Sequence, residues 1–172
     1  MCGVVGIIST QKPVAGELYD SLIHLQHRGQ DAAGIMTYNE RFHIKKGTGL
    51  IRDIFDEHNM LRLQGKVGID HTRYPTVGGF SIEEAQPVLT HVPYGIAMAH
   101  NGNLVNYTEL AKEVMEKDRR HINSSVDIEV ILHIFAHALD HPGSNTDGLP
   151  FFDQVCHAVD MVYDRVEGAY SV

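Results

Sequence analysis

The chain opens with the eight residues MCGVVGII (residues 1–8), in which a cysteine at position 2 precedes an apolar run. Such a run predicts a buried strand over residues 4–9. If Met1 is removed, Cys2 becomes the first residue and carries both a thiol and a free α-amine. Their unperturbed pKa values, about 8.5 and about 7.7–8.0, allow one residue to serve as nucleophile and base. Position alone favours the plainer interpretation, a small core cysteine at the start of a strand.

Beyond this strand, the pattern alternates between paired strands and helices. Helices are predicted at residues 13–28, 51–63, 106–117, 126–139 and 152–166, and strands at 33–38, 42–46, 67–72, 94–99 and 168–172. This order favours an α+β fold with antiparallel sheets and outer helices over a doubly wound parallel sheet. The last strand reads as one cut short, so we expect a longer protein to continue beyond Val172.

The composition is that of a soluble globular domain. The chain has 172 residues, which suits one domain (1–172), and its formal net charge is −8. With so few basic residues, we expect neither nucleic acid nor a membrane surface as a partner. Cys2 and Cys156 lie too far apart in sequence to suggest a disulfide framework, and Cys156 reads as a core residue. A reducing, cytoplasmic location is therefore expected.

Polar segments that could carry chemistry follow the predicted strands and helices. They are HRGQD (27–31), HTRYPT (71–76), AQP (85–87), HNGN (100–103) and SSVDIE (124–129). The planar guanidinium of Arg73 suits a carboxylate bound by two hydrogen bonds, although an arbitrary arginine is more often part of a surface or structural ion pair.

Two further segments each allow a functional and a structural interpretation. Asn101-Gly102 is a common tight-turn pair, but its side-chain amide and backbone N–H could also stabilise a developing oxyanion. Asp127 could simply favour the N-terminus of a helix, or it could bind a cationic group.

Taken in this order, Cys2 and the HRGQD, HTRYPT, HNGN and Asp-x-Glu segments resemble the glutaminase domain of the N-terminal-nucleophile (class II) glutamine amidotransferases. The Gln-Asp after HRG, the Tyr-Pro-Thr after Arg73 and Asn103 favour the member that opens purine synthesis; another class II member is the alternative. The resemblance implies a four-layer αββα sandwich in which two antiparallel sheets lie between helical layers.

The resemblance also implies the roles of individual residues. Cys2 would be the nucleophile, with Asn101 and Gly102 as the oxyanion donors. The α-carboxylate of glutamine would bind Arg73 and Thr76, and its α-ammonium group would bind Asp127. Supporting roles would fall to Arg28, Gly29 and Tyr74. The family's usual Ser-Asp-Thr-Glu is replaced here by Val126-Asp127-Ile128-Glu129, which keeps the acidic residues without the flanking hydroxyls.

Partners and cofactors follow from the same resemblance. L-glutamine would be the substrate, and the ammonia would pass to a C-terminal phosphoribosyltransferase domain that this chain lacks. No cofactor or metal is expected for the glutaminase domain, whereas Mg²⁺ is expected for the absent domain. The full-length protein is expected to form a homo-oligomer. The 172 residues alone should release ammonia without making phosphoribosylamine.

A histidine series supplies a competing hypothesis. His133, His137 and His141 recur every four residues and would share one helix face, as the ligands of a zinc-dependent hydrolase do. This stretch lacks the glutamate that follows the first histidine in a zinc-protease helix, so a partly solvated helix face is the better interpretation. A non-catalytic glutamine-sensing module is a third possibility, but it would not need Cys2.

Overall fold

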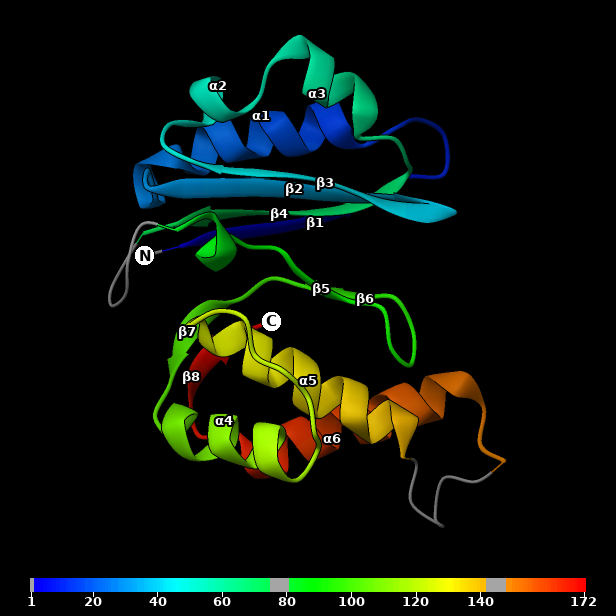
Figure 1. Ribbon diagram of the computed structural model, residues 1–172. Helices are drawn as coiled ribbons and strands as arrows, with labels where there is room; N and C mark the ends of the chain where they lie inside the picture. Colours follow the sequence, from blue (N-terminus) through cyan, green and yellow to red (C-terminus); the bar gives the residue numbers. More distant parts are fainter. Residues whose placement is uncertain (1, 75–80, 142–147) are drawn as a thin grey trace. The chain divides into compact units, whose positions relative to one another are not determined.

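The computed structural model describes residues 2–74, 81–141 and 148–172 (Figure 1). Thr76, one of the predicted substrate-binding residues, lies outside these ranges. The chain divides into two compact units. The first unit comprises Met1–Pro87, Met98–Asn101 and Ser171–Val172, and the second unit comprises Val88–Ala97 and Gly102–Tyr170.

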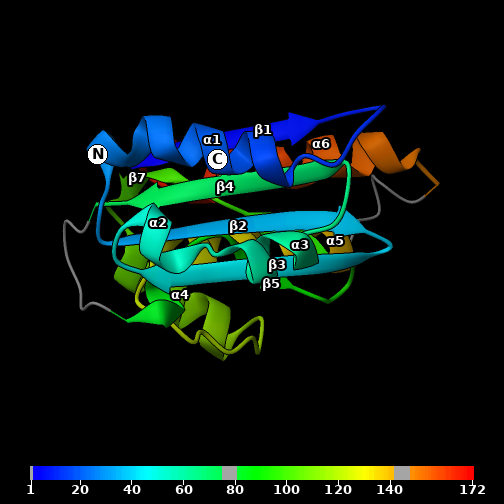
Figure 2. The ribbon, with the colours of Figure 1, turned by 90° about the horizontal axis from the view of Figure 1, so that it is seen from above.

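The first unit is built on a four-stranded antiparallel sheet. Its strands are β1 (Gly3–Ile8), β2 (Ala32–Asn39), β3 (Arg41–Thr48) and β4 (Val67–Arg73), in the spatial order β1-β4-β2-β3 (Figure 2). Strand β1 pairs with β4 so that Gly3 lies opposite Thr72. This register places Cys2 beside the end of β4, where Arg73 and Tyr74 follow.

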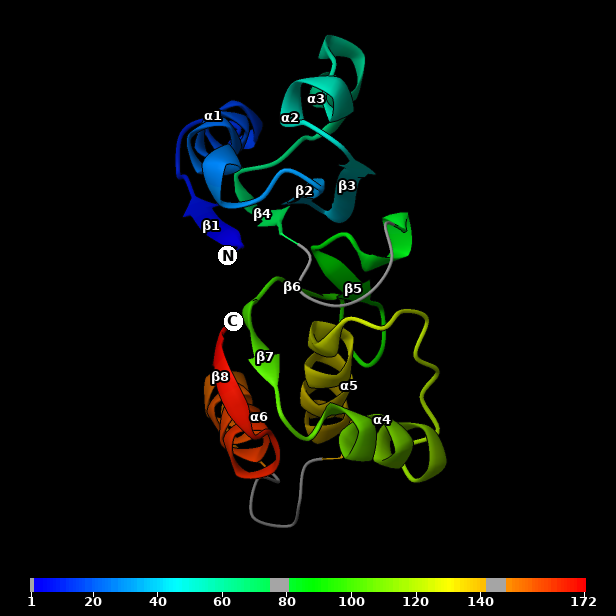
Figure 3. The same ribbon diagram turned by 90° about the vertical axis from the view of Figure 1, so that its left-hand side faces the viewer.

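Helices cover one face of this sheet (Figure 3). They are α1 (Ala15–Leu25), α2 (Ile51–Ile54) and α3 (Glu57–Arg62), with the short 3₁₀ helices η1 (Gln26–Arg28) and η2 (Ile82–Glu84) in the loops. Leu18 and Leu22 of α1 are fully buried against the sheet, as their spacing of four predicts. Removal of these apolar side chains from water stabilises the unit.

The single helix predicted over residues 51–63 is wrong. The structure breaks it into α2 and α3 at Phe55 and Asp56. Asp56 has extended backbone geometry, and its carboxylate accepts a hydrogen bond from the backbone N–H of Asn59 at 2.7 Å. An aspartate in this position caps a new helix, so the apolar pattern continues across a helix boundary.

The second unit contains the longer helices, α4 (Tyr107–Glu116), α5 (Asp127–Asp140) and α6 (Phe151–Arg165). Helix α5 packs against α4 and α6, and it carries more buried apolar side chains than either of these helices. Two-stranded sheets are formed by β5 (Val88–Thr90) with β6 (Ile96–Met98), and by β7 (Asn101–Leu104) with β8 (Gly168–Ser171).

The structure corrects three further sequence predictions. Strand β5 was not predicted. Asn101 does not leave a strand in a turn but begins β7. Cys156 is exposed on α6 rather than part of a core. Within the residues that the structure describes, no helix is both long and apolar enough to span a bilayer.

Candidate active site

Side chains from distant parts of the sequence converge on the main chain of Cys2. The carbonyl oxygen of Cys2 accepts a hydrogen bond from Arg28 Nε at 3.0 Å and another from Asn101 Nδ2 at 3.2 Å. The Cys2 thiol lies 3.9 Å from the carbonyl oxygen of Tyr74. Two side-chain donors on one carbonyl oxygen restrict rotation of the peptide that follows Cys2, and so they hold its backbone in place.

A cavity of about 350 Å³ opens beside Cys2. Its size suits a small substrate or product. The residues that line it all belong to the first unit: Cys2, Gly3, Val4, Leu25, Arg28, Asn101, Ser171 and Val172.

Arg73 is the last residue of β4 and is almost fully buried. Its Nη2 lies 2.8 Å from a carboxylate oxygen of Glu84, and its Nη1 donates to the Glu84 carbonyl oxygen at 2.6 Å. Sequence reasoning missed Glu84, because Glu83 and Glu84 look alike in the sequence and only the fold buries one of them. Arg73 thus forms the structural ion pair that the sequence left open, and its role in binding a substrate carboxylate stays a prediction.

Gly29 explains part of the HRGQD motif. A Cβ at this position would lie 2.6 Å from the carbonyl carbon of Arg73, so only glycine lets the two backbones approach so closely. The N–H of Asp31 also donates to the Arg73 carbonyl oxygen at 3.2 Å. The predicted supporting residues Arg28 and Gly29 therefore contact Cys2 and Arg73 respectively.

Two predicted site residues belong to the second unit. Asp127 begins α5, and its carboxylate accepts a hydrogen bond from the backbone N–H of Leu104 at 3.1 Å. At Gly102, a Cβ would lie 2.4 Å from the carbonyl oxygen of Ala169, so its partner strand β8 requires glycine there. The first unit brings together the remaining described candidates: Cys2, Arg28, Gly29, Arg73, Tyr74 and Asn101.

This arrangement occurs in a chain that closely matches known proteins. Residues 73–155 match the family described as "Glutamine amidotransferase domain". The whole chain is 49% identical over 173 residues to amidophosphoribosyltransferase of Pseudomonas aeruginosa and, over 99% of its length, 53% identical to that of Escherichia coli. Residues 73–155 therefore carry a glutamine amidotransferase domain. The whole chain spans about a third (34%) of the length of either relative.

Solved structures confirm the predicted fold class of this chain. It matches glutamine phosphoribosylpyrophosphate amidotransferase from B. subtilis, complexed with ADP and GMP, with a TM-score of 0.76 and 31% identity. It matches a structure described as "the allosteric regulatory enzyme of purine biosynthesis" with a TM-score of 0.78 and 33% identity. Each match covers 99% of this chain and 34% of the other. The α+β fold of N-terminal-nucleophile hydrolases, predicted from the motifs, is thereby confirmed.

The N-terminus of α5 is held by Glu129. Its carboxylate accepts hydrogen bonds from the backbone N–H groups of Asn123 and Ser124, both at 2.8 Å, and from their side chains. Burial opposes ionisation of Glu129, but the interaction with His133 and the hydrogen bonds from Ser124 and Asn123 outweigh it and lower the pKa to about 2. An ionised Glu129 therefore fixes the turn that presents Asp127, although Asp127 lacks the usual hydroxyl neighbours.

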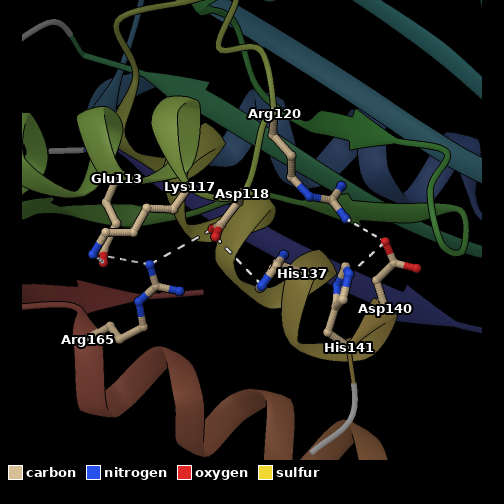
Figure 4. Close-up of polar contacts among 8 residues, drawn as sticks. All are labelled: Glu113, Lys117, Asp118, Arg120, His137, Asp140, His141 and Arg165. Carbon is tan, nitrogen blue, oxygen red and sulfur yellow. Dashed lines mark hydrogen bonds and ion pairs between the residues drawn. The ribbon is translucent and has the colours of Figure 1, made fainter.

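The histidines of the series contact carboxylates, and two of them, His137 and His141, are drawn in Figure 4. His137 Nε2 lies 3.6 Å from a carboxylate oxygen of Asp118, and the His137 ring stacks on His141 with centroids 4.4 Å apart. His133 instead faces Glu129 at 3.9 Å. Within residues 2–74, 81–141 and 148–172, no three or more histidine, cysteine or acidic side chains are grouped as metal ligands.

Proposed function

We propose that the chain hydrolyses L-glutamine to glutamate and ammonia, with Cys2 as the nucleophile. The observation that carries this proposal is the convergence of Arg28 and Asn101 on the Cys2 carbonyl oxygen, which holds in place the backbone of a cysteine at the second position of the chain. A structural cysteine would not require two polar side chains around its main chain. The match to the glutamine amidotransferase domain supports the same chemistry.

The reaction proceeds through a thioester. With Met1 removed, the α-amine of Cys2 takes the thiol proton, and the thiolate attacks the side-chain amide carbon of glutamine. The tetrahedral intermediate collapses as the amine returns a proton to the leaving nitrogen, which departs as ammonia. Water then attacks the γ-glutamyl thioester, so that the C–S bond breaks, glutamate leaves and the thiol is restored.

The negative oxygen of the tetrahedral intermediate is stabilised by the Asn101 side-chain amide and the Gly102 backbone N–H. Each donor of this kind typically lowers the barrier by about 3–4 kcal/mol. Asn101 is already 3.2 Å from the Cys2 carbonyl oxygen, so its amide group lies next to the nucleophile's own backbone. An amide nitrogen carries two N–H donors. One of them donates to Cys2, so the other can donate to the oxyanion.

Substrate selection relies on charge at both ends of the amino-acid backbone. Arg73 and Thr76 bind the α-carboxylate, and Asp127 binds the α-ammonium group. A glutamine within a peptide has neither charge, so it is rejected. Tyr74 supports the site through its backbone, since its carbonyl oxygen lies near the Cys2 thiol.

The proposed role in the cell is to supply ammonia for phosphoribosylamine synthesis from phosphoribosyl pyrophosphate. The relatives named amidophosphoribosyltransferase are about three times as long as this chain, and a C-terminal phosphoribosyltransferase domain would receive the ammonia. Mg²⁺ is assigned to that domain, and the glutaminase reaction uses no cofactor. A cytoplasmic homo-oligomer is the proposed form of the longer protein.

The test combines glutamate release from L-glutamine with the intact mass of the purified protein. Protein whose mass shows the loss of Met1 should release glutamate and ammonia in equal amounts. Protein that retains Met1 has no free amine on Cys2 and should be inactive. If processed protein releases no glutamate, the proposed function is wrong; if unprocessed protein is equally active, the α-amine is not the base.

A further inference from the structure

The segment from Ser81 to Pro87, here called the 81–87 segment, is held against the sheet of the first unit. Lys46 on β3 donates from its Nζ to the carbonyl oxygens of Ala85 at 2.5 Å and Pro87 at 3.4 Å. Lys46 thereby fixes the backbone on both sides of Gln86. Side chains carried by this segment are consequently held in defined positions relative to β4.

Glu84 lies in this segment and binds the guanidinium of Arg73. It contacts both terminal nitrogens of the guanidinium: a carboxylate oxygen forms an ion pair with Nη2 at 2.8 Å, and the backbone carbonyl accepts a hydrogen bond from Nη1 at 2.6 Å. Both residues are nearly inaccessible, with 9% of Arg73 and 7% of Glu84 exposed. Charge-assisted contacts on two nitrogens define the plane as well as the position of the guanidinium.

Gln86, which lies between the two carbonyl groups that Lys46 contacts, binds His100, the residue before Asn101. Its Oε1 accepts the backbone N–H of His100 at 2.7 Å, and its Nε2 lies 3.4 Å from Nδ1 of the His100 ring. On the other side, His71 Nε2 contacts the His100 carbonyl oxygen at 3.1 Å. Burial, followed by the neighbouring His100, lowers the pKa of His71 to about 3, so His71 is a neutral donor here.

Both backbone polar groups of His100 are thus bound by side chains that are at least 96% buried, those of Gln86 and His71. Asn101 follows directly and contacts Cys2. The position of the Asn101 amide beside the nucleophile therefore depends on how His100 is held.

We infer that Glu84 and Gln86 are positioning residues with separate tasks: Glu84 sets the orientation of Arg73 toward the substrate α-carboxylate, and Gln86 sets the position of Asn101 for the oxyanion. This inference rests on the proposed glutaminase function. The substrate carboxylate is bound before and during the reaction, whereas the oxyanion exists only in the transition state and intermediate. The two residues therefore affect different kinetic constants.

The experiment measures steady-state glutaminase kinetics of single variants of the Met1-processed protein. Glu84→Gln should raise KM for L-glutamine about tenfold while kcat changes by less than about twofold, the loss of one well-placed charged contact. Gln86→Met, which keeps the volume but no hydrogen bond, should lower kcat about tenfold or more with little change in KM. Gln86→Glu keeps an acceptor for the His100 N–H and should restore much of kcat.

Two controls separate positioning from general stability. Glu83→Gln changes the exposed neighbour of Glu84 and should alter neither constant. L-Glutaminamide has an amide in place of the α-carboxylate, so the preference of the protein for L-glutamine over this analogue should fall in Glu84→Gln and stay unchanged in Gln86→Met. A merely structural role would not produce this difference.

A double variant tests whether Glu84 acts through Arg73. In an Arg73→Lys background, Glu84→Gln should add little to KM, because Glu84 acts through Arg73. The inference is overturned if Glu84→Gln and Gln86→Met change the same kinetic constant, or if neither variant changes KM or kcat. It is also overturned if the effects of Arg73→Lys and Glu84→Gln on KM multiply in the double variant. If Glu84→Gln does not fold, Glu84→Asp gives the same comparison, since its shorter carboxylate displaces the guanidinium. An inactive wild-type protein would instead refute the proposed function.

Discussion

The carboxylate of Asp127 accepts a hydrogen bond from the backbone N–H of Leu104 at 3.1 Å. This contact joins the first residue of α5 to the strand that begins at Asn101. Asp127 therefore has a structural partner in addition to its proposed role with the substrate α-ammonium group. The two roles can be separated by substitution, because only one of them requires a negative charge.

Asp127→Asn should raise KM for L-glutamine about tenfold or more, because the charge that binds the α-ammonium group is lost. The asparagine oxygen can still accept the Leu104 N–H, so the melting temperature should change little. Asp127→Ala should raise KM as well and also lower the free energy of unfolding by about 1–2 kcal/mol.

The matched control is Asp153→Asn, which removes an exposed carboxylate from the first turn of another helix, α6. This control tests whether the loss of a favourable interaction with a helix dipole is enough to raise KM for L-glutamine. An unchanged KM in Asp127→Asn would show that Asp127 does not bind the α-ammonium group.

Cys2→Ala should abolish glutamate release while the thermal unfolding curve stays that of the parent protein. The thiol is the only protein group that acts as a nucleophile in the proposed mechanism, and alanine occupies less space at a partly exposed position. Cys156→Ala is the control, because Cys156 is exposed on α6 and should be dispensable. Appreciable turnover by Cys2→Ala would refute the thioester mechanism.

Arg73→Lys should raise KM for L-glutamine about tenfold with a smaller effect on kcat. A lysine ammonium cannot reproduce the planar fork, and it cannot keep both contacts to Glu84 in the same geometry. Steady-state kinetics measure the effect, with the exposed Arg52→Lys as the matched substitution. A KM equal to that of the parent would exclude Arg73 as the carboxylate-binding residue.

Asp70 makes the stability of the protein pH-dependent. Its side chain is buried on β4, and this burial raises its pKa from 3.8 to about 7, although a hydrogen bond from Ser21 opposes the shift. Between pH 4 and pH 7 the native state thus binds more protons at this site than the unfolded state. Its contribution to stability is present below about pH 4 and is lost as the pH rises through about 7.

Asp70→Asn should therefore raise the melting temperature at pH 8 and have little effect at pH 4. The stabilisation at pH 8 is at most about 4 kcal/mol, the equivalent of a shift of about three pKa units. Melting curves across this pH range measure the difference. Asp20→Asn, at the exposed aspartate that precedes Ser21 in the sequence, is the control and should show no such pH dependence. If Asp70→Asn changes the melting temperature equally at pH 4 and pH 8, the raised pKa of Asp70 is contradicted.

The fold was predicted well where apolar periodicity is long and unbroken. Residues 126–139 were expected to be helical, and α5 runs from Asp127 to Asp140. The prediction was wrong over residues 51–63, where a capping interaction by Asp56 interrupts a continuous apolar pattern. Strand β7 was missed because Asn-Gly is typical of turns, whereas pairing with β8 extends this segment.

The candidate site was only partly visible in the sequence. Motif order picked out Cys2, Arg73, Asn101 and Asp127, and the structure places Asn101 in contact with Cys2. Thr76 lies outside the described residues, and the catalytic roles remain predictions. Glu84 and Gln86 were missed as partners because burial of a short polar segment depends on Lys46, which lies about forty residues earlier in the sequence.

The sequence by itself determined the α+β fold class and the identity of the proposed nucleophile, because these follow from residue types and their order along the chain. Only the tertiary structure decided which polar groups contact one another: Arg28 and Asn101 with Cys2, and Glu84 with Arg73. The reason is physical. A hydrogen bond needs two groups within about 3 Å, and folding brings such groups together across separations that local patterns do not encode.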